Sequence, residues 1–327
     1  MVFFLIVLVV VASVVAATAT LLSRLGPIPV VIVLLTVIGI VTTLMRGLFR
    51  AAADLDRLLT ATRRVQDGDY TARLGQTRSR MAPVQELGRG FDTMVARLEA
   101  DELQRRTLLA DVSHELRTPL SVIKGNLEAI IDGVYAADEA HLAPILDETR
   151  VMERLIDDLR TVALSEAGTL TLHPEPTDPD VLIGEVIRAF TTTAEAGGIQ
   201  LTTEVEGDLP ILDIDPVRIR EVLSNLVANA LRHTPRGGTV AIGGSSTPAA
   251  VTLTVRDTGP GIDAALLPHV FDRFVKGAGS RGSGLGLAIA RGLMEAHGGS
   301  ISVASDSHGT VFRAVIPRPT DVRSADL

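Results

Sequence analysis

A regular apolar seam between residues 109 and 130 is the feature that most constrains how this chain folds. Its members follow one another at intervals of three or four residues: Leu109, Val112, Leu116, Leu120, Ile123, Leu127 and Ile130. This spacing predicts a long amphipathic helix with a coiled-coil-like seam. His114 lies two residues from both Val112 and Leu116, roughly 200° around the helix from each, so its imidazole is predicted to face away from the seam. An exposed histidine is either a nucleophile or a plain solvated side chain, and the rest of the chain must decide between them.

The first 45 residues contain a single charged side chain, Arg24, whereas the remainder is richly charged. Met1–Ser23 and Pro27–Met45 are uncharged apolar runs, each long enough to span a bilayer. A series of arginines follows them, at positions 46, 50, 57, 63 and 64, which places the C-terminal side in the cytoplasm. A signal peptide is the other interpretation of the first run, but no basic segment precedes it. We expect a two-helix membrane hairpin with a short external turn, too small for a folded sensor domain.

Composition excludes several classes of function. A chain of 327 residues predicts two or three domains. The formal net charge of −8 argues against a nucleic-acid partner. The absence of cysteine excludes disulfides, cysteine-ligated zinc and thiol catalysis.

Helical patterns dominate the middle of the chain. We expect helices over Arg50–Gln66 and Pro83–Glu99, separated by a break at Asp67–Tyr70 and a loop over Thr71–Arg80. The seam helix is expected from about Leu98 to Asp132, and a second amphipathic helix from about Glu139 to Glu166. The apolar face of that second helix is expected to comprise Leu142, Ile145, Thr149, Met152, Ile156, Leu159 and Ala163. Two such helices cannot bury both seams alone, which favours a dimeric four-helix bundle.

Strand and helix patterns alternate after Gly168, which predicts an α/β sandwich of about 150 residues. Strands are expected at Thr169–His173, Ile199–Val205, Thr239–Gly243, Val251–Arg256, Ser300–Ser305 and Val311–Ile316. Helices are expected at Pro179–Ala196, Asp215–Arg232 and Leu285–Ala296, the second of them opened by an Asp-Pro cap. The expected domain boundaries are 1–45, 46–100, 101–166 and 167–320, with a tail at 321–327.

Four polar or glycine-rich clusters follow one another in this α/β region. Asn225 and Asn229 are four residues apart on one helix face, and their amide oxygens suit a hard cation such as Mg²⁺. Asp257-Thr-Gly-Pro-Gly-Ile follows a strand, where a carboxylate can accept a hydrogen bond from an exocyclic amine such as that of adenine. Phe271-Asp-Arg-Phe-Val-Lys276 comes next, with a lysine that can reach phosphate.

The last cluster, Gly282-Ser-Gly-Leu-Gly-Leu287, opens a helix, which is a ready site for an anion. It is a poor dinucleotide fingerprint because no strand immediately precedes it. It also lacks the Gly-Lys-Ser/Thr ending of a Walker P-loop. Each cluster alone is a weak indication of function, so the prediction rests on the order in which the clusters occur together.

Together with Ser113-His-Glu-Leu-Arg-Thr-Pro-Leu120, these clusters resemble the H, N, G1, F and G2 boxes of membrane-bound sensor histidine kinases, over residues 46 to 317. The segment after the membrane resembles a HAMP linker, through Gly68-Asp-Tyr70 and the Glu86, Phe91-Asp92 and Met94 pattern, although a simple amphipathic connector is the alternative. The family implies a helical hairpin for dimerisation and histidine phosphotransfer. It also implies an ATP-binding domain of the type shared with gyrase and Hsp90.

The resemblance also implies roles for single residues. His114 matches the phosphoacceptor, Glu115 the base, and Thr118 the position that helps to place water for dephosphorylation. Pro119 removes an amide donor and is expected to bend the helix at the reactive site.

Within the ATP-binding domain, Asn229 matches the Mg²⁺ ligand and Asn225 a second candidate. The other positions matched to ATP contacts are Arg232, His233, Asp257, Gly259, Gly261, Lys276, Gly282, Gly284, Leu285, Gly286 and Leu287. The chain departs from the family pattern at His233 and Val275, where aromatic residues are usual.

The sequence therefore predicts a membrane-bound, ATP- and Mg²⁺-dependent protein-histidine kinase. It would phosphorylate His114, transfer the phosphoryl group to an aspartate of a response regulator, and act as a phosphatase as well. Two alternatives stay open: a dimeric scaffold that binds nucleotide without transferring phosphate, and a gyrase-like ATPase with Glu221 near its asparagines. The expected partners are a response regulator, a second copy of the chain and membrane lipid. With so short an external turn, a partner membrane protein is expected to supply the signal.

Overall fold

The computed structural model describes residues 27–75, 82–277 and 282–318, together with a few positions between 9 and 20. It divides into two compact units, Met1–Ala110 and Asp111–Leu327. The expected first membrane span and the tail at 321–327 therefore lie largely or wholly outside the described residues.

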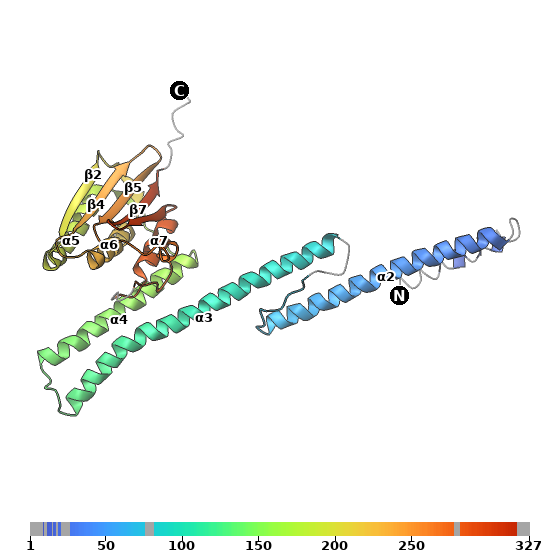
Figure 1. Cartoon of the computed structure of the whole chain (residues 1–327), viewed down its shortest axis with the longest axis horizontal. Helices are drawn as coiled ribbons and strands as arrows, with labels where there is room; N and C mark the ends of the chain where they lie inside the picture. The colour runs from blue at the N-terminus through green and yellow to red at the C-terminus, as the bar shows by residue number, and fades with distance from the viewer. Residues whose placement is uncertain are drawn as a thin grey trace, which may run out of the picture. The chain divides into compact units, whose positions relative to one another are not determined.

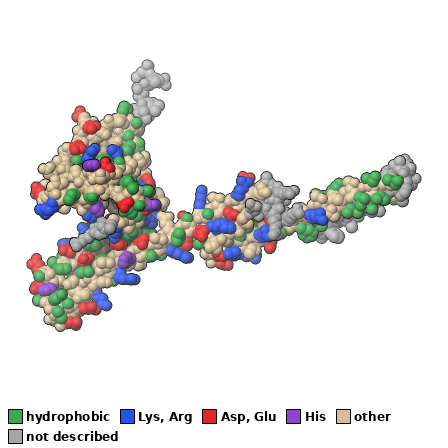
Figure 2. Space-filling view, in the orientation of Figure 1, with side chains coloured by type: hydrophobic (Ala, Val, Ile, Leu, Met, Phe, Trp, Pro, Cys, Tyr) green, Lys and Arg blue, Asp and Glu red, His purple; other side chains and the backbone are tan. Residues whose placement is uncertain are grey.

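The first unit is built on α2 (Pro27–Gln66) and the N-terminal part of α3 (Ala82–Ile131). Within the described residues, one helix is long and apolar enough to cross a membrane, over Val31–Gln66, with mean hydropathy 2.2 in its most apolar window. None of that window is buried, and Figure 2 shows exposed hydrophobic side chains along this part of α2. Ile28, Leu35 and Leu44 are each more than 60% exposed, as a lipid-facing helix would require.

The segment after the candidate span forms a small core of its own. Ala61 on α2 packs with Phe91 and Val95 on α3, supported by the partly buried Val65, Tyr70 and Leu74. The Asp92 carboxylate accepts the backbone N–H groups of Leu74 and Gly75, at 2.7 and 3.0 Å. The predicted helix over Arg50–Gln66 is thus the continuation of α2, and its break at Asp67 is confirmed.

The second unit begins with a helical hairpin, drawn in green in Figure 1. The seam helix ends at Ile131, with Gly133 in the left-handed region (φ 74°), and α4 spans Glu139–Glu166 as predicted. Asp138 caps α4 by accepting the N–H of His141. Val112, Leu116 and Ile123 are partly buried, whereas Leu109 and Leu120 are more than half exposed in this single chain.

Helix α4 buries residues beside the expected face. Leu155, Thr161 and Val162 are buried although they are not on that face, and Leu155 and Val162 belong to the core of the α/β domain. The helix carries a second apolar stripe, and this stripe is the one buried because α4 packs against α7 (Gly286–Ala296).

The α/β domain has a five-stranded sheet in the order β2-β4-β5-β7-β6. Its strands are β2 (Gln200–Glu206), β4 (Thr239–Ser246), β5 (Ala250–Asp257), β6 (Ser300–Asp306) and β7 (Gly309–Pro317). β2 pairs with β4 in parallel, and the other neighbours are antiparallel. Helices α5 (Pro179–Gly197), α6 (Pro216–His233) and α7 pack with the sheet to form an α/β sandwich (Figure 1).

The predicted strand at Thr169–His173 is wrong. This segment leaves α4 as irregular chain, because the Thr169 N–H is already bonded to the Leu164 carbonyl and the His173 N–H to the Asp215 carboxylate. The strand forms instead at β1 (Glu175–Thr177), which pairs with β3 (Leu212–Ile214), a strand that the sequence did not reveal. A 3-10 turn at Leu267–His269 lies in the segment between β5 and α7.

Candidate functional site

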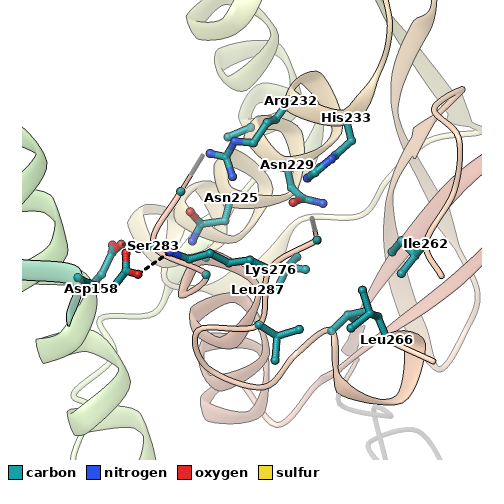
Figure 3. Close-up of a pocket in the computed structure, with 18 of the residues that line it drawn as sticks. Asp158, Asn225, Asn229, Arg232, His233, Ile262, Leu266, Lys276, Ser283 and Leu287 are labelled. Carbon is teal, nitrogen blue, oxygen red and sulfur yellow. Dashed lines mark hydrogen bonds and ion pairs between the residues drawn. The ribbon is translucent and has the colours of Figure 1, made fainter. Parts of the chain in front are cut away.

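A cavity of about 1300 Å³ lies in the second unit and is lined by α3, α4, α6, α7 and the loops between β5 and α7. Figure 3 shows Asn225, Asn229, Arg232 and His233 on α6, with Lys276 extending toward the side where Asp158 lies. Ile262 and Leu266 lie at the opposite end. The cavity thus has an apolar end and an end rich in polar and cationic side chains, as a nucleotide requires.

Helix α6 supplies one wall because its two faces differ in polarity. Asp215 caps its N-terminus by accepting the N–H groups of Val217 and Arg218, each at 3.1 Å, and Pro216 occupies the first turn, as predicted. Its buried face is apolar, made of Ile219, Val222, Leu223, Leu226, Val227 and Ala230. Asn225 and Asn229 are therefore left at the border of the core, facing the cavity.

Asp257 ends β5 and forms part of the cavity lining while only 5% exposed. Its Oδ1 accepts the N–H groups of Gly259 and Thr310, at 2.9 and 3.3 Å. Burial raises the pKa of this carboxyl above its usual value, although both hydrogen bonds oppose the shift. A buried carboxylate held in place by backbone donors can accept a hydrogen bond from a ligand amine.

The loop after Asp257 approaches β6 closely at Gly261. Its backbone is left-handed (φ 78°), and a Cβ there would overlap the Asp306 carbonyl. Glycine is thus required at this position on both grounds. His233 lines the same cavity as Asp257, and burial, followed by the charge of Arg232, lowers the pKa of its imidazole.

The cationic end of the cavity is formed around the N-terminus of α7. Gly284 is left-handed (φ 73°) and packs against the backbone of Phe274, and Gly286 lies against the amide of Asn225. Arg232 lies close to Gly282, since a Cβ added there would be 2.6 Å from the guanidinium Nη1. Backbone amides at a helix N-terminus, together with Arg232 and Lys276, can bind phosphate groups.

The helical hairpin contributes the remaining wall. Lys276 Nζ donates to Glu115 Oε1 at 2.7 Å, and Ser283 Oγ donates to Asp158 Oδ2 at 3.5 Å. Burial, followed by the nearby charge of Glu221, raises the pKa of Asp158 to about 6. Arg273 also pairs with Glu166, at the end of α4.

Most of the predicted site residues gather around this cavity. Those that line it are Glu115, Thr118, Asn225, Asn229, Arg232, His233, Asp257, Gly261, Lys276, Gly282, Gly284, Gly286 and Leu287. His114 is exposed, as predicted, but does not line the cavity. Gly259 is also not among the lining residues, and the Leu285 side chain is fully buried in the core.

Sequence reasoning missed the wall contributed by α4. Glu148, Arg154 and Asp158 line the cavity, as does Ser283 between the glycines. Arg154 and Asp158, four residues apart, share a face of α4, but nothing local in the sequence says which element that face meets.

Two family models match the part of the chain from residue 104 onward, which includes most of the second unit. Residues 104–168 match the HisKA family, the His Kinase A phospho-acceptor domain, and residues 214–320 match the histidine kinase-, DNA gyrase B- and HSP90-like ATPase family. The fold and the cavity therefore define a class of protein, in which an ATPase domain of this superfamily packs against a phospho-acceptor hairpin.

Named relatives narrow this class. The chain is 34% identical over 301 residues to the signal transduction histidine-protein kinase BaeS of Escherichia coli, covering 90% of this chain and 63% of BaeS. It resembles the Acinetobacter baumannii histidine kinase AdeS (TM-score 0.56, 29% identity, 62% of this chain and 97% of that one). It also resembles the histidine kinase ThkA in complex with the response regulator TrrA (TM-score 0.54, 25% identity, 69% and 67%). The chain belongs to the sensor histidine kinases of two-component systems, and it spans less than two thirds of the length of BaeS.

Proposed function

We propose that this protein is an ATP-dependent protein-histidine kinase that phosphorylates His114 and passes the phosphoryl group to an aspartate of a response regulator. The observation that carries the proposal is the cavity shared by the two matched domains. It brings Glu115 and Thr118 of the phospho-acceptor hairpin together with Asn229, Asp257 and Lys276 of the ATPase domain.

The lining of the cavity favours an ATP molecule with its adenine at the apolar end. Asp257 at the end of β5 would accept the adenine amine, in the cavity that the apolar Ile262 and Leu266 also line. The phosphates would then extend toward Arg232, Lys276 and the N-terminus of α7. The donor set also suits Mg²⁺, because Asn225 and Asn229 present amide oxygens on one helix face beside the expected phosphates. A bound Mg²⁺ would neutralise phosphate charge, with Asn229 as the protein ligand and Asn225 as a second candidate.

The proposed chemistry at the hairpin is general-base-assisted nucleophilic attack. A ring nitrogen of His114 forms a bond to the γ-phosphorus, the bond from the γ-phosphorus to the bridging oxygen breaks, and ADP leaves with that oxygen. Glu115 accepts the proton from the other ring nitrogen. Thr118, one turn further along α3 and in the cavity lining, would place the water that dephosphorylates the response regulator.

We further propose that the chain works as a homodimer anchored in the cytoplasmic membrane. The half-exposed seam of α3 needs a second copy to cover it, and the HisKA match supports a four-helix bundle. The candidate span on α2 supports a membrane anchor, to which the proposal adds a second span within Met1–Ser23. Residues 46–100 would act as a HAMP-like linker, and a partner membrane protein would deliver the signal.

One time course separates this function from its alternatives. The chain, in detergent or nanodiscs, is mixed with Mg²⁺ and γ-labelled ATP, and both ADP release and protein-bound label are followed. A kinase gives a burst of ADP matched by label on the protein, at most one per His114, after which both stop. Continued ADP release without label would support the gyrase-like ATPase, and nucleotide binding without either product would support the scaffold.

A further inference from the structure

Lys276 and Glu115 form an ion pair that joins the segment before α7 to the phospho-acceptor helix α3. The Lys276 Nζ to Glu115 Oε1 distance is 2.7 Å, and the two residues are 161 positions apart. Their side chains are only 26% and 25% exposed. At this burial an ion pair is less screened by solvent than an ordinary surface pair.

The ion pair holds the Glu115 carboxylate and the Lys276 ammonium together, although each has another role in the proposed reaction. Glu115 follows His114 directly, yet its carboxylate points into the cavity toward Lys276, whereas His114 is exposed and outside the cavity lining. Lys276 lines the cavity with Arg232, Gly282 and Gly284, where the phosphates of ATP are expected. Each partner is thus occupied by the other in this structure.

We propose that Lys276 is a positioning residue with two successive partners: Glu115 in the nucleotide-free protein, and the γ-phosphate once ATP is bound. The inference rests on the proposed function. A triphosphate brings several negative charges to Lys276, against the single charge of Glu115, and so competes for the ammonium group. Loss of the pair leaves Glu115 free to turn toward the imidazole of His114. Binding of ATP thereby frees Glu115 to act as the base when His114 is phosphorylated.

If Lys276 exchanges Glu115 for the γ-phosphate, nucleotide affinity should depend on Glu115. This can be measured without phosphotransfer. Glu115→Gln removes the competing charge, so the full chain should bind the Mg²⁺ complex of AMP-PNP more tightly, by on the order of three- to tenfold. The ADP complex, which has no γ-phosphate, should change by less than about twofold. In a Lys276→Ala background, the Glu115→Gln substitution should change neither affinity.

Glu148→Gln is the matched control, because Glu148 also lines the cavity but lies on α4, and among the described residues the ion-pair partner of Lys276 is Glu115. Its effect should be small and the same with and without Lys276. The proposal is overturned if Glu115→Gln leaves AMP-PNP affinity unchanged, tightens ADP equally, or acts equally in the Lys276→Ala background. If the unmodified chain binds neither nucleotide, the proposed function itself fails, and that outcome is distinct from the others.

Discussion

Gly292 on α7 packs directly against Ser165 on α4, and a Cβ added to Gly292 would lie 3.0 Å from the Ser165 Cβ and closer still to its hydroxyl. The two residues mark the contact through which the α/β domain packs against the helical hairpin. Nearby, Arg273 pairs with Glu166. A position with no space for one methyl group is a sensitive point at which to test this packing.

We expect Gly292→Ala to separate α7 from α4. Overpacking of this kind costs about 1–3 kcal/mol, so thermal unfolding should shift to lower temperature. Gly125→Ala, in a position of α3 with open space around it, is the control and should not destabilise the chain. Equal melting of the Gly292→Ala and unmodified chains would show that the contact does not form.

Asp257→Asn tests how the adenine end of the cavity works. The amide oxygen can still accept from Gly259 and Thr310, so the fold is expected to survive. The charged acceptor for the adenine amine is lost, which should weaken ATP binding roughly tenfold, in line with about 1.5 kcal/mol for a hydrogen bond to a charged group. Calorimetric titration measures this effect, with the cavity-lining Asp263→Asn as a control. Unchanged affinity would place the adenine elsewhere.

Asp158 should make the packing of the hairpin depend on pH. Its pKa is raised from 3.8 to about 6, so the folded protein favours the protonated form. The resulting stabilisation is fully present below about pH 4 and is lost as the pH rises through about 6. Asp158→Asn should therefore flatten the dependence of the melting temperature on pH between 4 and 7. An unchanged slope in the variant would assign the dependence to other groups.

The contact between Lys276 and Glu115 lies within one chain, which predicts that phosphotransfer within the proposed dimer also occurs within one chain. Mixed dimers of His114→Gln chains with Asn229→Ala chains should then remain unlabelled, because neither chain has both a working ATP site and an acceptor. Dimers of each variant with the unmodified chain should be labelled. Label on His114 of the Asn229→Ala chain would show transfer between chains.

The local features of the fold could be predicted from the sequence. The bounds of α4, the Asp-Pro cap of α6 and the strands β4 and β5 are each determined by residues within a few positions. The pairing of β1 with β3 could not be predicted, because each has three residues and the partner lies more than 30 positions away. An isolated three-residue pattern does not distinguish a strand from irregular chain.

Some residues of the candidate site could likewise be predicted from local motifs, and others could not. The motifs on α6 and before α7 were recognisable because the residues of each motif are contiguous in the chain. The wall formed by Arg154 and Asp158, and the pair between Glu115 and Lys276, depend on how the hairpin packs against the α/β domain. That packing uses the second apolar stripe of α4, and the sequence shows two stripes without saying which one meets α7.

The most direct test of the account is to locate the phosphoryl group after incubation with Mg²⁺ and γ-labelled ATP. We expect label that is lost in acid and stable in base, mapped to His114, and absent from His114→Gln although that variant still binds AMP-PNP. Acid-stable label, or label that survives in His114→Gln, would contradict the central claim.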